Sequence, residues 1–191
     1  MRRFTYGYRW LLSERGDYSM EFIIDSMTTP IGEIRIISDG ENLRALDFED
    51  YEPRMLKLLQ RQYGQVGFRD GENPGDATVR LGAYFAGDLE AITSLRVASN
   101  GSEFQQQVWR MLRNIPSGKT WSYGQLAKAI GKPSASRAVG LANGSNPIAI
   151  VVPCHRVIGA DGSLTGYGGG LARKQWLLQH EGALAQRQLS F

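Results

Sequence analysis

The chain has 191 residues, of which 42% are hydrophobic, and a formal net charge of +3. This length and apolar content indicate a globular protein of one ordinary domain or two small ones. The apolar run in the leading segment, Trp10 to Leu12, is too short for a signal peptide or a membrane helix, so we expect a cytoplasmic protein without a membrane partner. The single cysteine cannot form an internal disulfide and the two histidines give no zinc-site spacing, so we expect no metal and no cofactor.

The first half of the chain carries the signals of a hairpin followed by two helices. Short alternating apolar runs lie on either side of Asp39-Gly40, a common turn sequence, and predict an antiparallel hairpin. Helical spacing from Met55 to Tyr63, ended by Gly64, predicts a first helix, and a second is expected from Thr78 to Phe85. Gly87 to Gly101 shows no clear periodicity and is interpreted as the connection to a second module.

The second half contains three expected helix starts. Ser102 with Gln105, and Ser122 with Gln125, have the spacing of a capping box. After a tight turn that contains a glycine, Ser134 is expected to cap a further helix. The last two helices form a candidate helix-turn-helix, a motif that also occurs in many proteins without a DNA role.

Charge is distributed unevenly along this half. No Asp or Glu occurs from Phe104 to Ala160. Such a stretch favours a polyanion partner bound through phosphates, although a solvated basic face would have the same composition. The cationic residues in it are Arg110, Arg113, Lys119, Lys128, Lys132, Arg137 and Arg156.

The second helix of the candidate motif is slim. Its one long cationic side chain is Arg137, whereas a helix that reads the major groove usually presents several long polar side chains. A slim helix could approach the minor groove, which predicts DNA binding with little sequence preference. Small residues could equally allow close packing against a neighbouring helix. The small residues that we assign to DNA contact are Ala135, Ser136, Ala138 and Gly140.

The single thiol lies in a context that suggests chemistry. Ile148 to Val152 is wholly apolar and predicts a buried strand that ends just before Cys154 and His155. A lone cysteine can be a small buried hydrophobe, but a neighbouring histidine can accept its proton and make it a nucleophile. Glu181, after an expected helix from Lys174 to His180, could orient that histidine.

These motifs resemble those of the O6-alkylguanine-DNA alkyltransferases. The resemblance rests on PCHRV, preceded by NPIAIVV and followed by IGADGSLTGYGGGLARKQWLLQHEG, and it covers about residues 102–182. TPIGEIRI and LGAYFAGDL also look like the family's N-terminal domain. Without a preceding cysteine-rich zinc domain, the chain most resembles the stand-alone bacterial constitutive type.

The resemblance implies an α+β fold in two domains. Residues 20–101 would form a small antiparallel sheet with helices, similar to ribonuclease H. Residues 102–191 would form a mostly helical domain with a helix-turn-helix, similar to winged-helix proteins. Residues 1–19 would be an N-terminal extension outside the family pattern.

The resemblance also implies a role for each site residue. Cys154 would take the alkyl group irreversibly, activated by His155 through a bridging water, with Glu181 holding His155. Asn146 would join the helix-turn-helix to the active-site strand. Arg137 would be the finger that replaces the flipped-out base, and Tyr123 would donate a hydrogen bond or proton to the leaving guanine. Main-chain groups near Val157 would recognise the edge of that base. A loop that includes Tyr167, Gly168 and Gly169 would cover it.

Gly168 departs from the family pattern, because several members have a serine there. We expect extra room in the pocket for bulkier alkyl groups. The implied partner is double-stranded DNA with alkylated bases, and whether these include O4-alkylthymine is left open. We expect a monomer to bind this DNA, and cooperative binding along the DNA is also left open. The competing hypotheses are a cysteine hydrolase, a lesion-binding module that cannot accept the group, and a helix-turn-helix transcription regulator.

Overall fold

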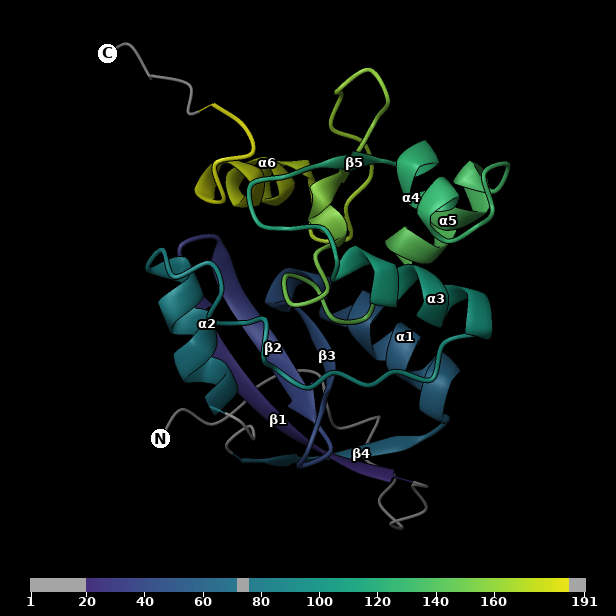
Figure 1. The fold of residues 1–191 in the computed structure, drawn as a ribbon. Coiled ribbons are helices and arrows are strands. Elements are labelled where there is room, and N and C mark those ends of the chain that lie inside the picture. The colour runs from purple at the N-terminus through teal and green to yellow at the C-terminus, as the bar shows by residue number, and fades with distance from the viewer. Residues whose placement is uncertain (1–19, 72–75, 186–191) are drawn as a thin grey trace.

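The computed structural model describes residues 20–71 and 76–185. The predicted extension, residues 1–19, and the last six residues of the predicted second domain, 186–191, lie outside the described part. In the first half, a four-stranded sheet has the order β3-β2-β1-β4 (Figure 1). Its strands are β1 (Met20–Thr29), β2 (Gly32–Ser38), β3 (Leu43–Phe48) and β4 (Val66–Asp70).

The sheet is mixed, which corrects the expectation of a wholly antiparallel sheet. The predicted hairpin is confirmed as β2 and β3, with Ile36 opposite Leu46. β1 pairs with β2 antiparallel but with β4 in parallel. The parallel arrangement follows from the connection, because the helix α1 (Glu52–Tyr63) carries the chain from β3 across the sheet to its far edge.

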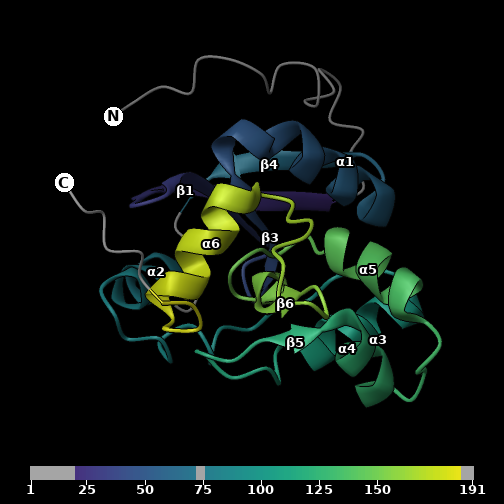
Figure 2. The same cartoon turned by 90° about the horizontal axis from the view of Figure 1, so that it is seen from above.

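Both faces of the sheet are covered by helices. α1 lies on one face, and α2 (Ala77–Phe85) lies on the other together with the C-terminal helices (Figure 2). Both helices begin and end close to their predicted limits, and Gly64 ends α1 with a φ of 74°. The apolar residues on the α1 side include Phe22, Ile37, Ala45, Met55 and Leu59, and those on the α2 side include Ile34, Ile36, Leu81 and Tyr84.

The second half is mostly helical. Both predicted capping boxes are present at the starts of α3 and α4. Ser134 does not cap α5, because the turn continues through a bond from the Ala135 amide to the Lys132 carbonyl and the helix begins at Ser136. The elements are α3 (Glu103–Leu112), α4 (Tyr123–Ala129), α5 (Ser136–Gly144) and α6 (Leu171–His180), with a two-stranded parallel sheet of β5 (Trp121–Ser122) and β6 (Val157–Ile158).

The apolar run from Ile148 to Val152 is not the predicted strand. It forms a compact turn, in which the Val152 amide donates to the Ile148 carbonyl over 3.0 Å and Ile150 has a φ of 67°. Its first residue makes an isolated bridge to Leu46, so the turn is fastened to the outer edge of β3. The wholly apolar composition of the run predicted a strand, but hydrogen bonds from the Asn146 side chain fold it into a turn.

The two halves share one apolar core. A single cluster of buried side chains extends from β2 and β3 through α2 and α3 to the turn before Cys154 and to α6. The segment between the halves, predicted to be a connection, runs along β3 and bridges Leu43 through Val97. Among the described residues, no helix combines the length and the hydropathy that crossing a bilayer would need.

Candidate active site

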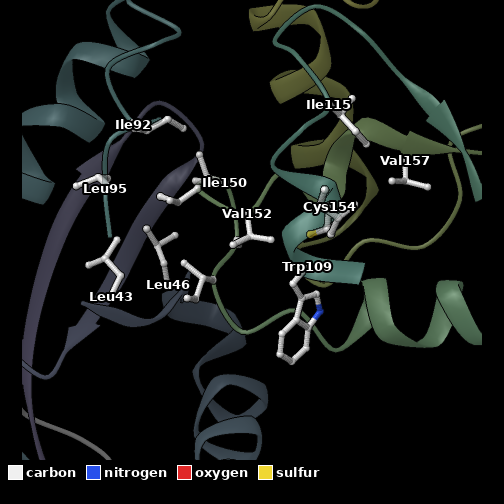
Figure 3. Packing of buried hydrophobic residues seen from close by; sticks show 14 of the residues in the cluster. Leu43, Leu46, Ile92, Leu95, Trp109, Ile115, Ile150, Val152, Cys154 and Val157 are labelled. Carbon is white, nitrogen blue, oxygen red and sulfur yellow. The ribbon is translucent and has the colours of Figure 1, made fainter. Parts of the chain in front are cut away.

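The sulfur of Cys154 lies at the junction of the two halves. Cys154 begins a short 3-10 helix (Cys154–Arg156) and is only 5% exposed. Figure 3 shows it among apolar side chains, near Val152 and Trp109. Burial raises the pKa of the Cys154 thiol, and a hydrogen bond with Asn146 opposes this effect only in part. The resting group is therefore a neutral thiol that must lose its proton in order to react.

The ring of His155, the next residue, is held through one of its two nitrogens. The Nε2 atom of His155 lies 3.0 Å from Oε1 of Glu181, and both side chains are fully buried. Burial lowers the pKa of His155, so the ring is neutral near pH 7. A neutral ring whose Nε2–H donates to the carboxylate leaves its Nδ1 lone pair free as an acceptor. Nδ1 has no hydrogen-bond partner among the described residues.

Besides His155, two other side chains hold Glu181 in place. Both of its oxygens accept bonds of 2.8 Å from the Arg156 guanidinium, and Oε1 also accepts the Tyr84 hydroxyl at 2.8 Å. Burial opposes ionisation of this carboxyl, but the bonds from His155 and Arg156 outweigh it and keep the pKa of Glu181 well below its usual value. The carboxylate is thus a fixed anion that orients the His155 ring.

Asn146 organises the turn that leads to the thiol. It lies two residues after the end of α5, and its amide nitrogen donates to the carbonyls of Ile148 and Val152 at 3.3 and 2.8 Å. Its amide oxygen accepts the Ile148 N–H at 3.0 Å. Together with its bond to Cys154, these contacts connect the helix-turn-helix to the reactive residue, at a turn and not at the predicted strand.

A loop from Gly159 to Gly170 follows the reactive residues, and Lys174 closes its base. The fully buried Nζ of Lys174 donates to the carbonyls of Val157 and Thr165, each at 2.6 Å. Burial lowers the pKa of Lys174 to about 8, and the nearby Cys154 opposes the shift. The ring of Tyr167, further along this loop, meets the His155 ring edge-on with centroids 6.3 Å apart.

The end of the loop rests on the first half of the protein. A Cβ atom on Gly168 would lie 2.6 Å from the guanidinium carbon of Arg54. The extra room expected at Gly168 is therefore filled by Arg54, which corrects that prediction. The Arg54 guanidinium is held by Asp47 and donates to the carbonyls of Gly144 and Asn146 at 2.8 and 3.1 Å.

Gly169 is the tightest point of this contact and supports a stability prediction. Its Cβ would lie 2.5 Å from Cε2 of Phe48, a fully buried ring. We expect Gly169→Ala to lower the free energy of unfolding by about 1–3 kcal/mol, as overpacking typically does. The control is Gly144→Ala, where a Cβ meets open space. Urea unfolding of both variants checks this, and equal stabilities would show that Phe48 yields freely.

The helix α5 has two different faces. Val139, Ala142 and Asn143 are buried, and Gly140 faces the ring of Tyr123, with its Cβ position 3.7 Å from that ring. Gly140 is half-buried against Tyr123 of α4, and its predicted contact with DNA stays a prediction. Ala135 and Ser136, at the start of the helix, are half-buried. The exposed residues are Arg137, Ala138, Leu141 and Gly144, and Leu141 is 74% exposed.

Tyr123 joins α4 to the loop. Its hydroxyl accepts a hydrogen bond from Oγ1 of Thr165 at 3.4 Å, which leaves its own proton available to another acceptor. Val157, in β6, is fully buried beside β5, the strand that directly precedes Tyr123. The predicted residues Cys154, His155, Glu181 and Asn146 therefore form one connected centre, with Tyr123 and Tyr167 at its loop side.

Sequence reasoning missed three residues of this centre: Arg54, Tyr84 and Lys174. The first two lie in the other half of the chain and reach the site only through the fold. Lys174 was placed on a helix but not at the site, although a lysine among buried helix positions is an unusual signal.

Comparisons with known proteins support this arrangement. Residues 23–99 match the family described as 6-O-methylguanine DNA methyltransferase, ribonuclease-like domain, and residues 103–183 match its DNA binding domain. A methylated-DNA--protein-cysteine methyltransferase of Shigella flexneri is 49% identical over 168 residues, which cover 86% of this chain and 98% of the relative. One of Mycolicibacterium paratuberculosis is 55% identical over 152 residues, which cover 78% and 92%.

A solved structure has the same architecture. It is Mycobacterium tuberculosis OGT in complex with DNA, which is 43% identical to this chain with a TM-score of 0.71. The match covers 86% of this chain and 94% of that one. Fold, site geometry and relatives agree, and the chain belongs to the 6-O-methylguanine DNA methyltransferase family.

Proposed function

We propose that this protein repairs DNA by direct reversal, with Cys154 as the acceptor of a methyl or other alkyl group from O6 of guanine. The observation that carries the proposal is the only thiol of the chain beside a fully buried His155–Glu181 pair. The family and the relatives' names support cysteine as the acceptor, and the tuberculosis relative bound to DNA supports DNA as the partner. A monomeric state, little sequence preference and a cytoplasmic location stay predictions.

The chemistry begins with a proton transfer. His155 Nδ1 takes the thiol proton through one bridging water while the sulfur attacks the alkyl carbon, so the thiolate forms only as it is used. Glu181 stabilises the imidazolium that results. A new bond joins sulfur to carbon, the bond between carbon and O6 breaks, and its electron pair goes to the guanine.

The leaving guanine carries negative charge, which a hydrogen-bond or proton donor must stabilise. Tyr123 can supply its hydroxyl proton, because Thr165 already donates to its oxygen. The amides of the loop at Gly168 and Gly169 are further donors. The product is a thioether, which has no good leaving group, so the thiol does not return and each molecule acts once.

Access to the alkyl carbon requires the damaged base to leave the helix, at a cost of a few kcal/mol. The exposed face of α5 is slim around Arg137, which suits entry into the minor groove. We propose that the Arg137 side chain fills the gap in the base stack and offsets part of this cost.

This proposal predicts that Arg137→Ala slows methyl transfer from duplex DNA by about tenfold to hundredfold, equivalent to ~1.4–2.8 kcal/mol. The loss should be much smaller when the lesion lies in a single strand, where no base pair must be broken. Arg110→Ala is the matched control, because Arg110 is an exposed arginine on α3. Arg110→Ala should weaken binding to the duplex and to the single strand by similar factors. Equal losses of Arg137→Ala on both substrates would contradict the gap-filling role.

One experiment separates the proposed function from its rivals. The protein is incubated with a duplex that contains O6-methylguanine, and its intact mass is then measured. The proposal expects a gain of one methyl group per molecule, located on Cys154 by peptide mapping. A cysteine hydrolase, a lesion-binding module or a transcription regulator would gain no mass, and that result would overturn the proposal.

A further inference from the structure

Tyr84, in the N-terminal half, reaches the proton relay of the active site. It lies near the end of α2, and its side chain is fully buried. Its hydroxyl donates to Oε1 of Glu181 at 2.8 Å, across 97 positions of sequence. The same oxygen accepts Nε2 of His155 at 3.0 Å and Nη2 of Arg156 at 2.8 Å. Three donors, one from α2 and two from the 3-10 helix that begins at Cys154, thus converge on one carboxylate oxygen.

The Tyr84 side chain is fixed in this position. Its ring makes edge contacts with the rings of Phe85 and His180, with centroids 5.3 and 5.2 Å apart. Nε2 of His180 also lies 2.7 Å from the Tyr84 carbonyl, which ties α6 to the end of α2. Burial, strengthened by Glu181, raises the pKa of Tyr84 well above its usual value, so the hydroxyl stays a donor. A phenylalanine would fill the same apolar space, and only the bond to Glu181 requires the oxygen.

We infer that Tyr84 is a positioning residue of the transfer reaction: its hydroxyl fixes the Glu181 carboxylate toward His155, so the N-terminal half helps to set the base that deprotonates Cys154. The inference rests on the proposed function. Tyr84 acts through Glu181 and does not touch the reacting atoms.

The hydroxyl should also tune the base. A carboxylate oxygen that accepts several bonds attracts the His155 N–H less strongly, so loss of the Tyr84 hydroxyl makes Glu181 more basic and favours the imidazolium. The other groups that face His155 are Arg156 beside it, Lys174 from α6, Cys154, and the Tyr167 ring. None of these is changed by replacing Tyr84 with phenylalanine.

The sign of the effect follows from the role of His155. Only neutral His155 accepts the thiol proton, so transfer slows as the pH falls through the His155 pKa. Without the Tyr84 hydroxyl that pKa rises, and the acid limb of the profile moves to higher pH. A purely structural loss would instead lower the rate by one factor at every pH.

The test compares Tyr84→Phe with Tyr63→Phe, which removes a hydroxyl bonded to Arg44 at 3.2 Å, in the same half but away from the thiol. Single-turnover methyl transfer from an O6-methylguanine duplex is followed from pH 5 to 9. The assay temperature is kept well below the melting midpoint of the less stable variant. For Tyr84→Phe we expect an acid limb displaced upward by about half to one pH unit, so that the transfer rate on that limb is lower by up to about threefold to tenfold. For Tyr63→Phe we expect the profile of the unmodified protein.

A second variant tests the route through Glu181. In a Glu181→Gln background, Tyr84→Phe should cause no further displacement of the acid limb. An unmoved limb in the single variant, or an equal displacement in the Glu181→Gln background, overturns the inference. If the unmodified protein gains no methyl group, the proposed function fails instead, and the two failures are distinguishable.

Discussion

Replacing Cys154 with serine is expected to abolish methyl transfer and leave lesion binding intact. A hydroxyl loses its proton far less readily than a thiol, and neutral His155 is too weak a base to ionise it. The exchange changes little volume, and the serine oxygen can keep a bond to Asn146, so the turn before it should persist. The exposed face of α5 is untouched.

Two measurements check this expectation. Intact mass after incubation with an O6-methylguanine duplex should show no added methyl group, and fluorescence polarisation should give a dissociation constant within about threefold of the unmodified protein, a difference below ~0.7 kcal/mol. An undamaged duplex is the control for lesion preference. A methyl group on Cys154→Ser would reveal another acceptor, and loss of binding would show that the thiol itself holds the lesion.

Replacing Arg156 with methionine is expected to be the most destabilising change in the site. Arg156 is 6% exposed and donates to both oxygens of Glu181, to the Ile115 carbonyl at 2.6 Å and to the Ser117 hydroxyl at 3.0 Å. Methionine keeps much of the apolar stem but leaves the Glu181 charge buried without its cation. Removal of one partner from a buried ion pair typically costs about 3–5 kcal/mol.

The pH dependence of this loss gives a sharper check. A carboxyl with a lowered pKa contributes stability above its unfolded value of 4.5, and this contribution is lost as the pH falls. Arg156→Met raises the folded pKa of Glu181, so the two proteins should differ most above about pH 5 and less toward pH 3. Urea unfolding across this range measures it.

Arg113→Met is the matched control for this pair of experiments. Arg113 is a half-buried arginine that donates to the carbonyls of Thr93 and Leu95. Its loss should cost about 1 kcal/mol with little pH dependence in the same range. Equal losses for both variants at every pH would show that the charge of Glu181 does not depend on Arg156.

Local signals in the sequence predicted the local structure well. The capping boxes at Ser102 and Ser122 and the turn at Asp39-Gly40 lie where their spacing places them, because each depends on a few neighbouring residues. The α+β class and the family are confirmed as well. Spacing could not reveal that β4 pairs with β1, since that pairing depends on a crossover helix between distant strands.

Two of the errors show what spacing along the chain does not reveal. The run Ile148 to Val152 is buried on all sides, and burial alone does not distinguish a strand from a turn organised by Asn146. Similarly, Gly168 suggested free space, which Arg54 of the other half occupies. The roles of the site residues, and the division of the chain at residues 101 and 102, stay predictions.

The bridges from Leu43 to Val97 and from Leu46 to Ile148 have a consequence for self-association. β3 is an outer strand of the sheet, and an uncovered outer strand offers free amides and carbonyls to any other chain. Here the connecting segment and the reactive turn occupy that edge, with bonds at Leu43 and Leu46. The turn that presents the thiol thus also covers part of this edge against pairing with another chain, and a fragment that ended before the turn would leave that part of β3 exposed.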